Sequence, residues 1–372
     1  MHRTLFLLII AGLLWGGASI AKDEPHLPQF RLPAGFEIEV LVDGLPYPRS
    51  MAWGDQGTLF VGTMRSGKVL AISDVMSGRP YVHTVAEKLK LPNGVAFRDG
   101  ALYVAEVRRI VRYPDIEAHL DAPGEPDLVT DALPYKSFQH AWKYLDFGPD
   151  GRLYVPVGMP CNICNEPDFG RILSMKPDGT DIQTVATGVR NSVGFAWHPQ
   201  TGELWFTDNG RDLLGDELPP DELNRVGDDG PADFGFPYCH AGDVADPEFG
   251  SLGRCEDARP PVQRLAPHAA ALGMLFYTGE QFPAGYRNQI FIAEHGSWNR
   301  SPEAGKTGYR VSLVRLDGNR AVSYEPFLQG FVDGDEVLGR PVDLLLAPDG
   351  SMLVSDDYSG RIYRVSYRRL SE

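Results

Sequence analysis

Short apolar segments alternate with polar turns along this chain, and one segment–turn–segment unit returns about six times. A clear copy is 145–159, where Pro-Asp-Gly separates two segments rich in Leu, Tyr and Val. Asp-Gly between such segments is a strong signal for a β-hairpin. The other copies begin at Met51, Gly94, Gly194, Gly273 and Val342.

These copies predict one all-β domain, because no helix-length amphipathic segment lies between them. Repeats of about 40 to 50 residues built from four short strands are typical of β-propeller blades. We therefore predict a single six-bladed β-propeller over residues 22–372. An extra alternating strand, Gly35–Val42, precedes the first copy and is expected to complete the last blade and close the ring. The polar segment of about 208–272 is expected to be an insertion.

The first 21 residues have the pattern of a signal peptide. A basic start at Arg3 precedes the apolar segment Leu5–Trp15, and Ser19-Ile20-Ala21 gives a small-x-small cleavage site. The alternative is an uncleaved anchor, but the apolar segment is short for a bilayer. We expect a periplasmic or secreted protein with no membrane span in the mature chain. A net charge of -15 argues against nucleic acid as a partner.

Export favours disulfides for the four cysteines. The simplest pairing joins Cys161 to Cys164 and Cys239 to Cys255, although four cysteines permit three pairings. A zinc site is the alternative. A covalent haem is disfavoured, because Asn165 stands where the attachment motif has histidine.

Polar residues flank the apolar strands of five blades and differ from one copy to the next. Propeller loops gather around one mouth of the central channel, so these residues are candidates for a site. They are Asn93, His140, the pair Arg190-Asn191, the segment Glu294–Arg300 and Arg340. Singly, each has an ordinary explanation as a surface, ion-pair or turn residue. Together they indicate a site for a polyanionic small molecule, with a histidine able to take a proton.

The order of these motifs resembles the glucose/sorbosone dehydrogenase family over nearly the whole mature chain. The resemblance rests on His140 before Leu-Asp-Phe-Gly-Pro-Asp-Gly, on Gly188-Val-Arg-Asn191, on Asp221-Glu-Leu-Asn224 followed by Phe234-Gly-Phe-Pro237, and on Arg340-Pro341. Members are soluble quinoproteins that hold pyrroloquinoline quinone (PQQ) and calcium on a six-bladed propeller. The Glu-His-Gly-Ser-Trp-Asn-Arg segment is closer to the sorbosone dehydrogenase branch.

The resemblance implies a role for each matching residue. His140 corresponds to the base that takes the hydroxyl proton of a sugar. Arg190 and Asn191 correspond to the pair that contacts the cofactor, and Arg340 to a second clamping residue. The carbonyls of Gly235 and Pro237 correspond to calcium ligands, which are typically oxygens.

This chain also departs from the glucose-oxidising members. His295 stands where they have a clamping lysine, and Val342 where they have a second clamping arginine. Asn93 is the nearest polar substitute for a missing glutamine, and Lys143 stands in for an arginine. A preference for glucose therefore does not follow. Further polar residues that are candidates for substrate choice are Asp208, Asn209, Arg211 and His268.

The sequence thus favours an exported PQQ- and calcium-dependent dehydrogenase of a sugar or sugar-derived aldehyde. It has no haem motif, so a separate electron acceptor, a cytochrome or a quinone, is expected. The alternatives are a calcium-dependent lactonase-type hydrolase and a non-enzymatic propeller that binds a ligand.

Overall fold

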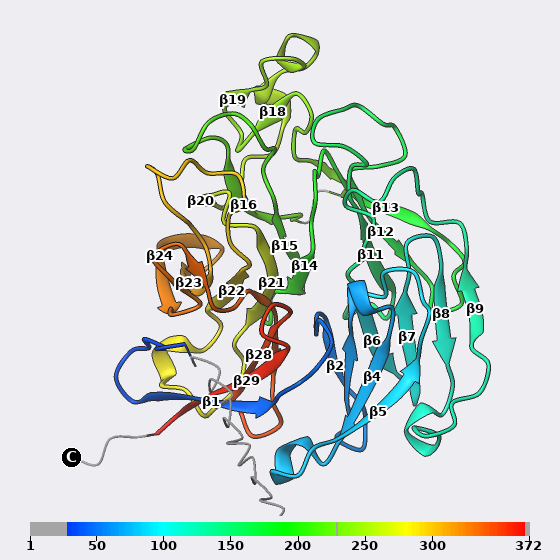
Figure 1. Ribbon diagram of the computed structural model, residues 1–372. Coiled ribbons are helices and arrows are strands. Elements are labelled where there is room, and N and C mark those ends of the chain that lie inside the picture. The colour runs from blue at the N-terminus through cyan, green and yellow to red at the C-terminus, as the bar shows by residue number, and fades with distance from the viewer. Residues whose placement is uncertain (1–27, 228–229, 369–372) are drawn as a thin grey trace, which may run out of the picture.

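A computed structural model describes residues 28–227 and 230–368 as six β-sheets arranged around a common centre (Figure 1). The all-β six-bladed propeller predicted from the repeats is confirmed. Within the described residues there is no α-helix, and no helix has the length and apolarity needed to span a bilayer. The predicted signal peptide lies outside these residues.

The first three blades follow the order of the chain. Blade 1 contains β2 (Met51–Trp53), β3 (Leu59–Gly62), β4 (Val69–Ser73) and β5 (Tyr81–Ala86). Blade 2 contains β6 (Gly94–Arg98), β7 (Ala101–Ala105), β8 (Ile110–Tyr113) and β9 (Asp127–Thr130). Blade 3 contains β10 (Asp146–Phe147), β11 (Leu153–Val157), β12 (Arg171–Met175), β13 (Gln183–Thr187) and β17 (Ala232–Asp233).

The last three blades complete the ring. Blade 4 contains β14 (Gly194–Trp197), β15 (Leu204–Asp208), β16 (Pro220–Arg225) and β20 (Gln263–Pro267). Blade 5 contains β21 (Ala271–Phe276), β22 (Ile290–Glu294), β23 (Arg310–Asp317) and β24 (Arg320–Leu328). Blade 6 contains β27 (Pro341–Leu346), β28 (Met352–Asp356), β29 (Arg361–Tyr367) and β1 (Phe36–Val42).

Shorter elements lie in the connections. Two small hairpins are β18 (Cys239–His240) with β19 (Val244–Ala245) and β25 (Val332–Asp333) with β26 (Glu336–Val337). The 3-10 turns are η1 (Met64–Ser66), η2 (Val75–Ser77), η3 (Ile116–Ala118), η4 (Gly250–Leu252), η5 (Cys255–Asp257) and η6 (Ala284–Tyr286).

The N-terminal strand closes the ring as predicted. Strand β1 pairs antiparallel with β29, with Phe36 opposite Tyr367 and Val40 opposite Tyr363. The last blade is therefore built from the first and the last described strands, β1 and β29, which lie side by side in Figure 1. This pairing protects the edge of β29 from pairing with another chain.

Each gap between neighbouring blades holds its own hydrophobic cluster. Phe60 and Val95, for example, pack between blades 1 and 2. Because a blade has a neighbour on each face, its second strand is buried on both sides, and every residue of β28 is buried. This explains the continuous apolar segments that mark each copy in the sequence. A separate small cluster near the ring axis joins Trp142, Val193, Leu272 and Val342 from blades 3 to 6.

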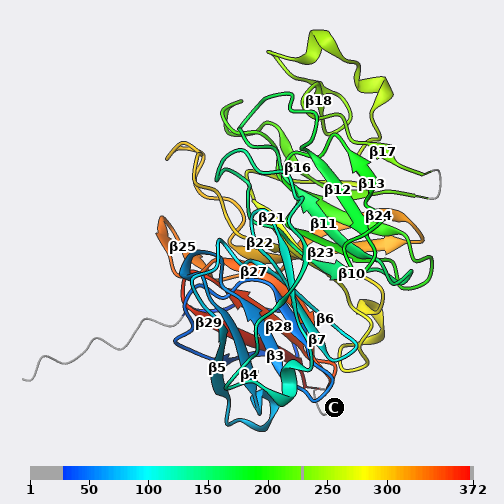
Figure 2. The same ribbon diagram turned by 90° about the vertical axis from the view of Figure 1, so that its right-hand side faces the viewer.

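The segment predicted as an insertion, about 208–272, is only partly one. It supplies two strands of blade 4, β16 and β20, and the connection between them carries the β18–β19 hairpin, which projects from the ring (Figures 1 and 2). Strand β16 looks like a loop in the sequence because Asp221, Glu222 and Asn224 are polar, yet all three are buried.

Both disulfides join the predicted cysteines. Cys161 is bonded to Cys164 and Cys239 to Cys255, so the described chain has no free cysteine and the zinc alternative is wrong for these residues.

Candidate functional site

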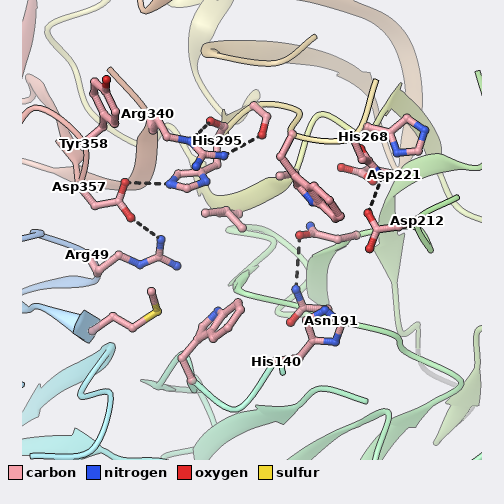
Figure 3. A pocket seen from close by; sticks show the side chains of 18 of the residues that line it. Arg49, His140, Asn191, Asp212, Asp221, His268, His295, Arg340, Asp357 and Tyr358 are labelled. Atoms are coloured by element: carbon pink, nitrogen blue, oxygen red, sulfur yellow. Dashed lines mark hydrogen bonds and ion pairs between the residues drawn. The ribbon is translucent and has the colours of Figure 1, made fainter. Parts of the chain in front are cut away.

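A cavity of about 560 Å³ is lined by loops from five of the six blades (Figure 3). Its wall includes residues that precede the first strand of a blade, such as Asn191 and Arg340, and residues that follow a second strand, such as His295. These positions meet because the start of one strand and the end of its antiparallel neighbour lie at the same edge of a sheet. The cavity brings together His140, Arg190, Asn191, His295 and Arg340, and two of the residues predicted for substrate choice, Asn209 and His268, also line it.

His140 is a buried, neutral histidine with a defined tautomer. Its Nδ1 lies 2.8 Å from the carbonyl oxygen of Met159. A carbonyl only accepts hydrogen bonds, so Nδ1 carries the proton and Nε2 carries the lone pair. Burial, together with the nearby charge of Arg190, lowers the pKa of His140 from 6.5 to about 3. At neutral pH the residue is therefore a proton acceptor through Nε2.

Arg190 is almost fully occupied by the protein. Its Nε and Nη2 donate to the main-chain oxygen and Oδ1 of Asn162, both at 2.9 Å. Nη1 donates to the carbonyl of Asn209 at 3.1 Å, and Nη2 also pairs with Asp212 at 3.0 Å. A guanidinium has five N–H groups, so one remains for a ligand. Asn162 lies inside the small ring that the Cys161–Cys164 disulfide closes.

Asn191 is positioned through its backbone. The amides of Arg190 and Asn191 donate to the two carboxylate oxygens of Asp208, at 2.8 and 2.6 Å. Burial, with the charge of Glu222 adding to it, raises the pKa of Asp208 to about 8. Asp208 thus fixes the loop through these two amides, although it does not line the cavity itself.

His295 and Arg340 belong to a second network. The Nε2 of His295 lies 2.8 Å from Oδ1 of Asp357, and Nη1 of Arg49 donates to Oδ2 of Asp357 at 2.8 Å. Arg340 donates to the carbonyls of His295 and Gly296 at 3.1 and 2.9 Å. Burial lowers the pKa of His295 to about 4, so it is neutral. Burial alone would raise the pKa of Asp357, but His295 and Arg49 hold it below its usual range.

Asn93 and Lys143 do not line the cavity, although both are buried beside it. Asn93 accepts a hydrogen bond from Nε of Arg49 at 2.8 Å and donates to the carbonyl of Lys143 at 2.9 Å. The Nζ of Lys143 donates to the carbonyl of Ala141, and burial lowers its pKa to about 7. In this structure both residues support the wall of the cavity from behind.

The predicted calcium ligands also lie outside the cavity lining. The carbonyl oxygen of Gly235 accepts the backbone amides of Tyr238 and Cys239, at 2.8 and 2.9 Å, which uses both of its lone pairs. In the described ranges no group of three or more His, Cys, Asp or Glu side chains is arranged to hold a metal. The carbonyl of Gly235, as arranged, therefore has no lone pair left for a calcium ion.

Sequence analysis missed Arg49, Asp212 and Asp357, which line the cavity. Arg49 had a recognisable signal, because it precedes the first strand of blade 1 as Arg340 precedes that of blade 6. Asp357 had none, since its role depends on contact with Arg49, which is 308 positions away. Aromatic residues that are largely exposed also line the cavity: Tyr47, Trp298 and Tyr358.

Comparisons with known proteins agree with this architecture. An uncharacterized protein of Borreliella burgdorferi is 33% identical over 383 aligned positions, covering 99% of this chain and 98% of that protein. The PQQ domain of Coprinopsis cinerea pyranose dehydrogenase, in holo form, has a TM-score of 0.72 at 19% identity, covering 91% and 97% of the two chains. A calcium structure of a Trichoderma reesei carbohydrate-active enzyme of family AA12 has a TM-score of 0.76 at 19% identity, covering 94% and 99%.

These structural likenesses, at low identity, show the shared fold. Residues 117–364 match the family described as glucose/sorbosone dehydrogenase. Because this match covers most of the propeller, the chain belongs to the glucose/sorbosone dehydrogenase family.

Proposed function

We propose that this protein is an exported quinoprotein oxidoreductase that oxidises a sugar or sugar-derived aldehyde, with PQQ as its cofactor. The observation that carries the proposal is a neutral histidine, His140, with an available Nε2, in a cavity whose other side is rich in arginine (Figure 3). Family membership and the PQQ-containing domain of similar fold add support. The two disulfides support export, since such bonds persist in oxidising compartments.

PQQ fits the donor set of the cavity. It is a planar molecule with three carboxylates, and arginine forks suit such groups. Arg340, Asn191 and the remaining N–H of Arg190 are the predicted donors that would hold its carboxylates. His295, also predicted to contact the cofactor, is neutral and its Nε2 donates to Asp357, so only its Nδ1 lone pair faces a ligand. When bound, PQQ supplies the quinone carbonyl that accepts hydride, and the protein supplies position and charge.

His140 would act on the substrate. Its Nε2 accepts the proton of the hydroxyl group that is oxidised, and Met159 then stabilises the imidazolium through the Nδ1–H hydrogen bond. The same burial and positive charge that lower its pKa favour loss of that proton after turnover. Electrons leave through a separate acceptor, a cytochrome or a quinone.

Calcium remains a separate prediction, tested by chelation. If the carbonyls of Gly235 and Pro237 rearrange to hold calcium, a chelator weakens PQQ binding by at least tenfold. Equal PQQ affinity with and without the chelator refutes the predicted calcium site and leaves the oxidoreductase proposal standing.

An absorbance spectrum tests the function. Purified protein is mixed with PQQ and then with a panel of aldoses and sorbosone, and reduction of the quinone by at least one of them is expected. Lactone hydrolysis is assayed in parallel. Hydrolysis without any quinone reduction would favour the lactonase-type alternative, and binding without either activity would favour the non-enzymatic one.

A further inference from the structure

The arginines of the cavity differ in how many of their guanidinium N–H groups already donate hydrogen bonds within the protein. The guanidinium of Arg190 donates four hydrogen bonds, to Asn162, Asn209 and Asp212, and it forms an ion pair with Asp212. The guanidinium groups of Arg49 and Arg340 each donate two hydrogen bonds within residues 28–227 and 230–368. In the same ranges, Nη2 of Arg49 and Nη1 of Arg340 have no hydrogen-bond partner, and each guanidinium retains three N–H groups.

A third arginine, Arg65, lines the same cavity from η1 of blade 1. It is exposed, and no ion pair or hydrogen bond of its guanidinium is found in the described part of the chain. Burial lowers the pKa of Arg340, and the charges of Arg49 and Arg65 each add to this effect, so both lie within electrostatic range of Arg340. They come from neighbouring blades, 1 and 6.

One carboxylate opposes these three charges. Asp357 is bonded to Arg49 and His295 through its two oxygens, and His295 is neutral. The other two acidic side chains of the cavity, Asp212 and Asp221, lie across it in Figure 3, near Asn191 and His268. The wall formed by Arg49, Arg65 and Arg340, named here the arginine wall, therefore keeps an excess of two positive charges.

We propose that the arginine wall is an anion-binding subsite that takes a carboxylate group of the ligand, with Arg49 and Arg65 supplying charge beyond Arg340. Arg49 and Arg340 are held by buried contacts and present free N–H groups, which is the arrangement that suits a carboxylate. The carboxylate has two sources, PQQ itself or an acidic sugar. Naming PQQ makes this part of the inference rest on the proposed function.

The position two residues after Arg340 carries no charge. Val342 occupies that position and packs in the apolar cluster near the ring axis with Val193 and Leu272. Arg49 and Arg65 supply positive charge instead. Both belong to blade 1, which is the neighbour of blade 6 in the closed ring. Sequence order hides this substitution, because Arg49 and Arg340 are separated by most of the chain.

Calorimetric titration of the apo-protein with PQQ is the first arm of the test. If PQQ supplies the carboxylate, each of three variants should bind PQQ about 10- to 100-fold more weakly, the effect of losing a charged hydrogen bond. These variants are Arg49→Gln, Arg65→Gln and Arg340→Gln. Arg79→Gln is the matched control, since Arg79 is exposed and does not line the cavity. This readout requires no turnover, so it can succeed even if the proposed activity fails.

The second arm compares galacturonate with galactose, by calorimetry or as substrates of the loaded enzyme. If an acidic sugar supplies the carboxylate, the same variants lose the preference for galacturonate while PQQ affinity is unchanged. Citrate, a tricarboxylate, serves as a probe of the apo-protein by thermal shift. Protection of the wild type by citrate that is lost in the variants supports the subsite without either natural ligand.

Folding defects are separated by the choice of variants. Arg49→Gln leaves Asp357 with a missing partner, so each variant is checked by its unfolding temperature. Arg65→Gln removes an exposed side chain that has no hydrogen bond or ion pair to the described residues, so it carries the decisive result. If PQQ, galacturonate and citrate bind Arg65→Gln and Arg340→Gln as they bind wild type, or if none of them binds wild type, the proposal is overturned.

Discussion

Gly158 lies so close to His140 that a Cβ atom at position 158 would come within 2.8 Å of the Cβ of His140. The same atom would lie 3.1 Å from Oδ1 of Asn191. Gly158 follows β11 of blade 3, whereas Asn191 precedes the first strand of blade 4. The missing side chain of Gly158 thus allows His140, the proposed base, and Asn191 from the next blade to approach each other.

Replacement of Gly158 by alanine should displace His140 or Asn191 and lower kcat by about 10- to 100-fold, since small misplacements of reacting groups have effects of that size. Gly124→Ala is the control, because a Cβ at Gly124 meets no atom within 4 Å. Steady-state kinetics of both variants check this. Equal kcat for Gly158→Ala and Gly124→Ala would contradict the idea that this contact sets the geometry of His140.

His140→Ala should lower turnover by roughly 100- to 10,000-fold, the usual contribution of a general base. PQQ affinity should change little, because the residue is proposed to face the substrate. The exposed His119 provides a control replacement. If His140→Ala keeps near-normal turnover with the best substrate, His295 or His268 becomes the candidate base.

The pH dependence of kcat/KM should show no loss attributable to His140 until the solution is strongly acidic. Its pKa is lowered from 6.5 to about 3, mainly by burial, so the free base persists through mild acid. The same shift affects stability. Between pH 6.5 and about 3, His140 binds a proton in the unfolded chain but not in the folded one. The free energy of unfolding therefore decreases as the pH drops through this range. A rate profile with an acid limb near 6.5 that His140→Gln abolishes would contradict the assignment of the lowered pKa.

Lys143 should destabilise the protein at neutral and lower pH. Burial lowers its pKa from 10.5 to about 7, so stability rises with pH between these values, where the unfolded chain binds the extra proton. Lys143→Met should therefore raise the free energy of unfolding by roughly 3 to 5 kcal/mol at pH 6, less the loss of one hydrogen bond. The gain should shrink toward pH 10. Denaturant unfolding at both pH values tests this, with the exposed Lys88→Met as control; a gain that does not depend on pH would refute it.

The two disulfides should have different effects when removed. Cys239 and Cys255 are separated by 16 positions, so Cys239→Ser with Cys255→Ser should lower the free energy of unfolding by about 3 kcal/mol. The shorter ring of Cys161 and Cys164 constrains the unfolded chain less, but it holds Asn162 against Arg190.

The double variant Cys161→Ser, Cys164→Ser should therefore affect ligand binding in the cavity more than stability. It should raise KM or lower the affinity for PQQ more than the double variant Cys239→Ser, Cys255→Ser does. Asn162→Ala should reproduce this effect with both disulfides intact, because Oδ1 of Asn162 accepts from Arg190. Calorimetry and unfolding curves of the three variants provide the comparison. If Asn162→Ala has the same KM and the same PQQ affinity as wild type, Arg190 does not need support from Asn162.

The repeating pattern of apolar strands was enough to determine the propeller, because each blade buries both faces and so repeats the same local requirement. The spare strand Gly35–Val42 and the cysteine pairs could also be predicted, since each follows from short-range pattern or from export. His140, Arg190, Asn191, His295 and Arg340 were found because they interrupt a repeat at its loops. Asn93 and Lys143 interrupt it in the same way, yet they lie behind the cavity wall.

Only the tertiary structure decided which polar groups are occupied and which are free. Arg190 and Arg340 look equivalent in the sequence, but the packing of loops from blades 3 and 4 places Arg190 against Asn162 and Asp212, while Arg340 keeps unused N–H groups. Arg49 acquires its role from Asp357 at the other end of the chain. The physical reason is that tertiary contacts between loops decide which N–H groups are occupied, and no local sequence pattern records partners that lie 19 to 308 positions away.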